Sequence, residues 1–292
     1  MKTEFPEFAC PYSQRLAAKS PRFAWQVYDS KSKKLNNGER HSAYSADPFG
    51  ELSHASKVKG LKQRFPDRVL IMTTERCFMN CRHCTRQGLF GRTATCESAA
   101  DLKRCVAYVK AHPKVRDVLL SGGDILTLPD KKVMEFVNAF AALPQVEVVR
   151  VCTRAVCTNP PRITAALAKA LGRSKKVWVN TQFNCADEVT DEARQAAARL
   201  VEAGIPVSCQ TVLLRGVNDS AAEMCRLFRA LTAARIRPYY VFTCDPIAGI
   251  DHFRVSDAKA RQIEAKCAES VGGLALPRFV KDLPGAKRKL PI

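Results

Sequence analysis

A chain of 292 residues that is 46% apolar can bury a sizeable core, which excludes a disordered tail and leaves room for one large domain. It has no run of about 18 apolar residues, and Lys2, Glu4 and Pro6 interrupt its start, so we expect neither a membrane span nor a signal peptide. The 47 basic and 28 acidic side chains give a net charge of +19, which favours anionic partners, although a solvated cationic surface is the simpler interpretation.

The cysteines indicate a reducing compartment. There are 13 of them, an odd number in a long chain without an export signal, so reduced thiols in a cytoplasm fit better than a disulfide framework. Three lie close together as Cys77, Cys81 and Cys84, and the other ten are scattered. We expect most of the scattered thiols to be small, buried side chains.

The first 60 residues differ from the rest of the chain. They carry several prolines, serines and lysines and show little periodicity. We interpret residues 1–60 as a short N-terminal extension with at most one helix, at about Ser13–Tyr28, and residues 61–292 as the main domain.

From residue 69 onward, short apolar runs alternate with amphipathic stretches in six units of roughly 30 residues, the size of a βαβ repeat. We expect strands at Val69–Met72, Asp117–Leu120, Val146–Val151, Lys176–Val179, Pro206–Val212 and Tyr239–Phe242. We expect helices at Ser98–His112, Lys131–Leu143, Arg162–Leu171, Thr190–Ala203, Ser220–Ala233 and Ser256–Ser270. The segment Leu274–Val280 could add a final strand.

These short, continuous apolar runs are typical of a buried parallel sheet. Six such units predict an α/β fold, a partial (β/α)6 barrel of the TIM type, and a doubly wound sheet is the structural alternative.

Polar side chains follow every predicted strand. They are Cys77–Arg86, Ser121–Asp124, Thr153–Arg154, Asn180–Asn184, Gln210 and Asp245. Because the catalytic residues of α/β barrels lie in the loops after the strands, we expect these groups to gather at one rim. A structural protein would have little reason to carry them, so the pattern favours an enzyme.

The cysteine triplet indicates a soft metal centre. Three thiolates in one loop can bind zinc or an iron–sulfur cluster, and structural zinc sites usually have four ligands. Three ligands would leave one iron of a cluster open to a further ligand. His83 lies between Cys81 and Cys84, and we expect it to pack or to form hydrogen bonds nearby rather than to bind the metal.

The CxxxCxxC loop after the first strand resembles that of the radical S-adenosylmethionine (SAM) enzymes. Gly122-Gly123-Asp124, after the second strand, matches the glycine-rich motif of that class. The resemblance implies a [4Fe–4S] cluster on Cys77, Cys81 and Cys84, whose open iron chelates SAM and whose electron cleaves it to a 5′-deoxyadenosyl radical. It also implies SAM contacts from Gly122, Gly123, Asp124 and Gln210.

A closer resemblance is to the lysine 2,3-aminomutases, and it runs from about Asp47 to the C-terminus. The motifs that carry it are Val58–Leu61, Arg64–Leu70, Cys81–Arg86, Leu119–Asp124, Gln210–Asp219 and Arg237–Tyr240. These motifs are long and specific, so they support a family assignment better than the cysteine spacing alone.

The family also uses pyridoxal 5′-phosphate (PLP). Its PLP lysine lies in a stretch that matches Pro284–Pro291 here, which implies that Lys289 forms the Schiff base. Arg64 and Arg68 match the positions that bind the PLP phosphate, and two arginines suit a dianion.

The resemblance further implies a substrate site. Arg86 matches the residue that binds the substrate carboxylate, and Asp245 and Asp282 match the pair that binds the ε-ammonium. Two carboxylates favour a cationic amino acid, lysine first and arginine second, because a buried ammonium must be paired.

The chain departs from the family at several positions near PLP. Ala286–Arg288 replaces a glycine run, which crowds the loop and makes Lys287 a competing amine. Gln182 stands where His is common, and Phe242 where Tyr is usual. These differences leave open a radical SAM enzyme that has lost PLP and acts on another substrate.

The family resemblance implies an isomerase that converts L-lysine to β-lysine by moving nitrogen from C2 to C3. The alternatives are an arginine 2,3-aminomutase and, from the brevity of the chain, the type that makes (R)-β-lysine for elongation factor P. The partners implied are an amino acid and an external electron donor of the flavodoxin or ferredoxin type, and a homo-oligomer is left open. A basic module that binds nucleic acid or protein is a further alternative, which the lack of aromatic stacking motifs disfavours.

Overall fold

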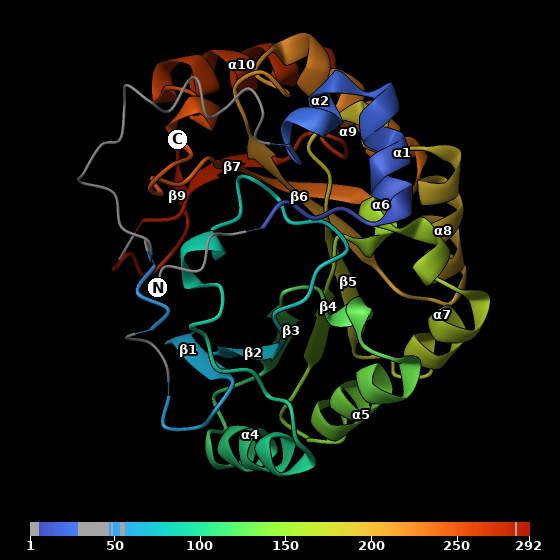
Figure 1. Cartoon of the computed structure of the whole chain (residues 1–292), viewed down its shortest axis with the longest axis vertical. Coiled ribbons are helices and arrows are strands. Elements are labelled where there is room, and N and C mark those ends of the chain that lie inside the picture. The colour runs from blue at the N-terminus through green and yellow to red at the C-terminus, as the bar shows by residue number, and fades with distance from the viewer. Residues whose placement is uncertain (1–5, 29–46, 48, 53–55, 284) are drawn as a thin grey trace.

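The computed structural model describes residues 6–28, 47, 49–52, 56–283 and 285–292, and its named strands form a single sheet (Figure 1). In sheet order and in chain order these strands are β1 (Leu61–Phe65), β2 (Arg68–Thr74), β3 (Asp117–Gly122), β4 (Val148–Cys152), β5 (Val177–Gln182), β6 (Val207–Leu213), β7 (Arg237–Thr243), β8 (Arg278–Lys281) and β9 (Leu290–Pro291). Strands β2 to β8 are parallel, and β1 and β9 are antiparallel strands at the two edges.

The sheet curves around the centre of the molecule, and the connecting helices lie outside it (Figure 1). They are α4 (Ala99–Ala111), α5 (Asp130–Ala141), α7 (Ala165–Gly172), α8 (Asp191–Glu202), α9 (Ala221–Ala233) and α10 (Asp257–Ser270). In the described part of the chain the two edge strands do not pair with each other, so the barrel is open. The expected partial barrel is therefore confirmed, and a doubly wound sheet is excluded because the strand order never reverses.

The predicted elements agree closely with the observed ones. Each of the six expected strands and six expected helices is present, and Leu274–Val280 supplies most of β8. The largest difference at a helix start is at α7, which we expected from Arg162. A separate 3₁₀ turn occupies Pro160–Arg162, and the Thr164 side chain accepts the Leu167 N–H, so α7 begins after Thr164.

The expectation of a single helix at Ser13–Tyr28 is wrong. Two short helices, α1 (Pro11–Lys19) and α2 (Pro21–Trp25), replace it. Pro21 has no N–H to continue α1, and it holds Ser20 in an extended conformation, where the Ser20 hydroxyl caps α2 through the Phe23 N–H. The parts of the predicted extension at 1–5, 29–46, 48 and 53–55 lie outside the described residues.

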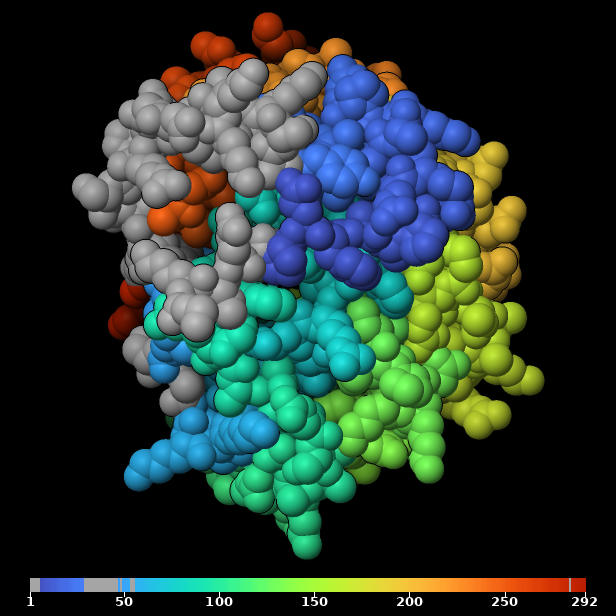
Figure 2. Space-filling view, in the orientation of Figure 1, coloured from blue at the N-terminus to red at the C-terminus, as the bar shows by residue number. Residues whose placement is uncertain are grey.

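Residues 6–28 pack against the cysteine-rich loop that follows β2. Ala9 forms a β-bridge with Met79, the Cys10 N–H donates to the Phe78 carbonyl at 2.8 Å, and the Asn80 N–H donates to the Phe8 carbonyl at 2.8 Å. In Figure 2 this blue segment lies across the face toward the viewer, next to the cyan loop. The segment therefore supports the loop that carries the cysteines.

Every scattered cysteine except Cys152 is buried, as expected, and all of them are free thiols. No helix in the described part of the chain combines the length and the apolarity needed to cross a membrane.

Candidate functional site

Cys77, Cys81 and Cys84 line one cavity with Gly122 and Gly123. Among the described residues, no three His, Cys, Asp or Glu side chains converge closely enough to hold a single metal ion. A cubane cluster places its thiolates on different irons, so three cysteines spread around one cavity fit a cluster better than they fit a lone ion.

The electrostatics of the loop also suit a cluster. Burial is the main cause that raises the pKa of Cys84 to about 11 and that of Cys77 well above its ordinary value. At neutral pH both groups are therefore thiols in the protein alone. Only a cationic partner such as iron would ionise them, and binding it would release protons.

The two glycines after β3 are required by the neighbouring backbone. A Cβ on Gly122 would lie 2.4 Å from the Thr74 carbonyl oxygen, and one on Gly123 would lie 2.3 Å from that of Arg76. Instead, the Gly123 N–H donates to the Thr74 carbonyl at 2.6 Å. The structure thus gives the glycines a role that the motif did not predict, which is to let the start of the cysteine loop lie against the end of β3.

Asp124 is buried, and its carboxylate is bonded within the protein. It accepts hydrogen bonds from the Thr153 hydroxyl at 2.7 Å, the Arg154 N–H at 2.8 Å and the Leu126 N–H at 3.0 Å. Burial raises its pKa, and these hydrogen bonds oppose the rise. Asp124 thus joins the loop after β3 to the loop after β4, and its contact with SAM stays a prediction.

Gln210 lies on β6 and takes part in a chain of polar side chains inside the barrel. Its Oε1 accepts the Tyr239 hydroxyl at 3.1 Å, and Asn180 donates to that same hydroxyl at 3.2 Å. The three side chains come from adjacent strands β5, β6 and β7, which shows that the polar groups do gather as expected.

Arg86 lines the cysteine cavity and contacts a carboxylate that the sequence did not single out. Its Nε lies 3.0 and 2.9 Å from the two oxygens of Glu51, and its Nη1 donates to the Gly122 carbonyl at 3.1 Å. Burial acts to lower the pKa of Arg86, and the charge and hydrogen bonds of Glu51 outweigh it, so the pKa is raised. Arg86 is therefore built to hold a carboxylate in a buried place.

Lys289, Asp282 and Arg64 form a second cluster at the open edge of the barrel. Asp282 pairs with the Lys289 ammonium, and its Oδ1 lies 3.0 Å from Nη1 of Arg64. Arg64 also donates to the carbonyls of Leu283 at 2.7 Å and Ala286 at 3.2 Å. Three residues predicted for PLP and substrate are thus in contact. In this structure the Arg64 guanidinium and the Asp282 carboxylate bind other groups of the protein.

The charges of Asp245 and Arg68 also act on this cluster. Burial, followed by the charge of Arg64, lowers the pKa of Lys289 to about 8; Asp245 raises this pKa and Arg68 lowers it. Burial raises the pKa of Asp245 to about 7, with Lys289 opposing. The Arg68 guanidinium lies over the Phe65 ring, 4.5 Å from its centroid, and pairs with Asp67 at 3.0 Å.

The altered loop before Lys289 does not crowd its amine. Lys287 and Arg288 are exposed, whereas Lys289 is half-buried with its Nζ 5.3 Å from the centroid of the Phe242 ring. Of the two lysines, only Lys289 faces the cluster of charged groups. Pro284, the first residue of the predicted stretch, lies outside the described residues.

The two clusters are joined through β1. Lys62, two residues before Arg64 on β1, donates through Nζ to the Glu51 carbonyl at 2.6 Å, and the Glu51 side chain holds Arg86 in the wall of the cysteine cavity. The group predicted to bind a substrate carboxylate therefore lies between the cysteines and the edge strand that carries the Lys289 cluster.

His83 is buried and hydrogen-bonded, as expected. Its Nε2 lies 3.1 Å from the Gln182 amide nitrogen and 3.2 Å from that of Asn184. Burial, and then the charge of Arg154, lowers its pKa well below the ordinary value, so the ring is neutral. Gln182 therefore serves as a partner of the cysteine loop at the position where the family commonly has His.

Comparison with known proteins places the chain in a family. Residues 71–228 match the radical SAM superfamily. The chain belongs to that superfamily. It is 42% identical over 84% of its length to L-lysine 2,3-aminomutase of Fusobacterium nucleatum, and it spans 58% of that protein. A putative L-lysine 2,3-aminomutase of Treponema pallidum is 35% identical, with 86% of this chain and 71% of that protein covered.

A glutamate 2,3-aminomutase of Clostridioides difficile is also similar, at 33% identity over 84% of this chain and 58% of that protein. Among solved structures, Streptococcus suis SuiB bound to its precursor peptide SuiA has a TM-score of 0.57 at 14% identity, over 76% of this chain and 50% of that one. That likeness shows the fold alone.

The resemblance drawn from the motifs is therefore confirmed: within the radical SAM superfamily the chain is a relative of the lysine 2,3-aminomutases. Membership of the superfamily implies a [4Fe–4S] cluster and SAM. The chain spans less than two thirds of the length of the first of these relatives.

The sequence predicts no role for Glu51 or Glu188, and it places Arg154 only among the polar residues expected at the rim. Each is a charged side chain that becomes notable only through a partner far away in the sequence. The one local signal was the place of Arg154 in the loop after β4.

Proposed function

We propose that this chain is a PLP-dependent radical SAM 2,3-aminomutase that converts L-lysine to β-lysine. The observation that carries the proposal is the continuous path from the cysteine cavity, through Arg86 and Glu51, to the edge strand β1 and the Lys289 cluster. An aminomutase of this kind needs a radical source, a carboxylate-binding group and a PLP lysine close together, and the path supplies a candidate for each.

Each residue has a role that its surroundings support. Cys77, Cys81 and Cys84 would hold the cluster, and Lys289 would hold PLP covalently through its amine. A pKa of about 8 gives Lys289 a larger neutral fraction at neutral pH than an exposed lysine has, and only the neutral amine is a nucleophile. When bound, SAM supplies a radical and PLP spreads the unpaired electron during nitrogen migration.

The charges of the Lys289 cluster favour lysine as the substrate. Asp245 and Asp282 both lie near Lys289. A side-chain ammonium would lower the raised pKa of Asp245 and pair with both carboxylates, whereas the side chain of glutamate would be repelled. Arg86 would bind the α-carboxylate, and the Glu51 side chain, with which it pairs in the structure, would give way to it. Arginine is the second candidate because its side chain is also cationic.

The substrate is tested with anaerobically reconstituted protein, PLP, SAM and a strong reductant, supplied in parallel with L-lysine, L-arginine and L-glutamate. Mass analysis of the products should show β-lysine as the main product. If no β-lysine forms while cluster and PLP are both occupied, lysine is not the substrate.

The PLP site is tested with two lysine variants. We predict that Lys289→Ala abolishes the absorbance band of protein-bound PLP. It should also lower activity by roughly 1,000-fold or more, because a covalent catalytic group is lost. Lys287→Ala is the matched control, since that side chain is exposed two residues away, and it should keep the band. If only Lys287→Ala lost the band, PLP would be bound to Lys287, and the assignment to Lys289 would be wrong.

The electron that the cluster needs would come from a small donor protein of the flavodoxin or ferredoxin type. The net charge of +19 suits an acidic donor.

A further inference from the structure

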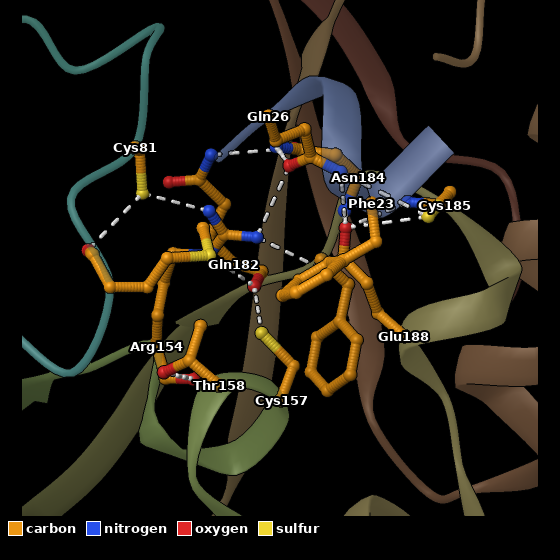
Figure 3. Close-up of polar contacts among 12 residues, drawn as sticks. Phe23, Gln26, Cys81, Arg154, Cys157, Thr158, Gln182, Asn184, Cys185 and Glu188 are labelled. Carbon is orange, nitrogen blue, oxygen red and sulfur yellow. Dashed lines mark hydrogen bonds and ion pairs between the residues drawn. The ribbon is translucent and has the colours of Figure 1, made fainter. Parts of the chain in front are cut away.

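A buried arginine contacts one of the cluster cysteines (Figure 3). Arg154 lies after β4, immediately before the short helix α6 (Ala155–Thr158), and its Nη1 donates to Cys81 Sγ at 2.9 Å. The Arg154 side chain is 12% exposed. A charged N–H group thus contacts the sulfur directly.

The position of this guanidinium is fixed from three sides. Its Nη2 lies 3.0 Å from Oε2 of Glu188 and 3.3 Å from Oε1 of Gln26, and its Nε donates to the Gln182 carbonyl at 3.3 Å. These partners come from the 3₁₀ turn after β5, from the residue that follows α2, and from β5 itself. Arg154 therefore has little freedom to leave Cys81.

Glu188 is itself fully buried and held in place. Its Oε1 accepts the Gln26 amide at 2.8 Å and the backbone N–H groups of Asn184 at 3.2 Å and Cys185 at 3.3 Å. A buried carboxylate that accepts this many hydrogen bonds is held in one place beside the guanidinium. The unit that faces Cys81 is thus a fixed ion pair with its positive end toward the sulfur.

We propose that Arg154 is a positioning residue for Cys81 that also raises the reduction potential of the cluster. On reduction the cluster gains one electron from the external donor and no bond forms or breaks, so nearby positive charge stabilises the reduced state more than the oxidised one. Hydrogen bonds to ligand sulfur act in the same direction. Glu188 opposes the effect by offsetting part of the charge of Arg154. This inference rests on the proposed cluster ligands and not on the substrate.

The test is an anaerobic redox titration of the reconstituted cluster, followed by electron paramagnetic resonance, without PLP or amino acid. Arg154→Gln should lower the ratio of reduced to oxidised cluster at a fixed potential about tenfold, which is about 59 mV for one electron. Arg154→Lys should recover part of the shift, since it keeps the charge and loses the planar fork. Glu188→Gln should shift the potential upward, because a buried negative charge is removed.

Arg162→Gln is the matched control. Arg162 also holds loops together, by donating to the carbonyls of Leu126 at 2.7 Å and Leu128 at 2.9 Å and by pairing with Asp130, and none of these partners is a cluster cysteine. The reduction potential of the cluster in Arg162→Gln should equal that in the wild type.

An unchanged potential in Arg154→Gln with full iron content overturns the proposal, as does a shift of equal size in Arg162→Gln. Should Arg154→Gln fail to fold or to bind iron, Glu188→Gln decides, and an unchanged or lower potential in that variant overturns the proposal. The cluster ligands are checked separately: if Cys81→Ala retains a normal cluster, the ligand assignment fails, and the role of Arg154 fails with it.

Discussion

Gly123 is constrained by the backbone of a neighbouring loop. The Arg76 carbonyl oxygen lies 2.3 Å from the place where a Cβ would sit, and it cannot move aside as a flexible side chain would. We predict that Gly123→Ala displaces the loop before Cys77, lowers the free energy of unfolding by about 1–3 kcal/mol and reduces the iron bound per chain. Gly273→Ala is the control, because its added Cβ meets no heavy atom within 4 Å. Equal iron content in the two variants would show that a Cβ at position 123 does not displace the cysteine loop.

Asp245 makes the stability of the protein depend on pH. Burial raises its pKa from 3.8 to about 7, so between these pH values the folded chain keeps a proton that the unfolded chain has released. The contribution of this group to stability is present below about pH 4 and is lost as the pH rises through about 7. The pKa of Lys289 is lowered to about 8, so this group changes the stability only above about pH 8, outside the range in which Asp245 acts.

We therefore predict that Asp245→Asn removes a fall in the free energy of unfolding between pH 4 and pH 7, of up to about 4 kcal/mol. Urea unfolding of the wild type and the variant at pH 4 and pH 7 measures this change in the free energy of unfolding. The same change with pH in both proteins would show that Asp245 is not buried in this way.

The residues that sequence alone could identify are those with a local pattern. Cys77, Cys81 and Cys84 share one loop, and Lys289 lies in a recognisable stretch. Glu51 gave no such signal, and Arg154 gave only its place in the loop after β4, because their partners Arg86 and Cys81 lie 35 and 73 positions away in the chain. Long-range pairs of this kind are determined by the fold, and periodicity does not record them.

Among the secondary-structure elements, the N-terminal segment has a clearer role than its composition indicates. It joins the cysteine loop through backbone hydrogen bonds, one of which runs from the Cys10 N–H to the Phe78 carbonyl. Cys10 has φ −65°, a value that proline adopts without strain. A Cys10→Pro substitution can therefore remove this N–H with little change to the backbone.

We predict that Cys10→Pro lowers the free energy of unfolding by about 1–3 kcal/mol, the cost of a buried carbonyl left without its donor, and speeds loss of iron from the reconstituted protein. Cys10→Ala is the control, since it removes the thiol and its contact with the Thr158 carbonyl but keeps the N–H. Iron loss at the same rate in both variants would mean that this contact does not support the loop.

The alternation of strands and helices could be predicted because the buried strands contain short apolar runs and because α4, α7, α8, α9 and α10 each begin after a Ser or Thr whose side chain caps the helix. Edge strand β1 was missed since Leu61–Phe65 carries Lys62, Gln63 and Arg64 and looks like a loop. The break between α1 and α2 at Ser20 was missed as well, although Pro21 was a local signal for it.

At the scale of the whole molecule, the open barrel brings together groups that are distant in the chain. The parallel strands end at one rim, where the loop after β2 carries the cysteines, while the antiparallel strands β1 and β9 bring Arg64 and Lys289 to the open edge. Arg86 and Glu51 connect the two regions. We therefore propose that the cysteine cavity generates a radical next to a binding site for an amino acid.

The yield of 5′-deoxyadenosine from SAM measures whether this radical forms. Anaerobically reconstituted protein with a strong reductant should form 5′-deoxyadenosine, and the yield should rise when PLP and L-lysine are added. The variant with Cys77, Cys81 and Cys84 all changed to Ala should form none. A wild-type protein that binds iron and sulfide in full but yields no 5′-deoxyadenosine would contradict the account.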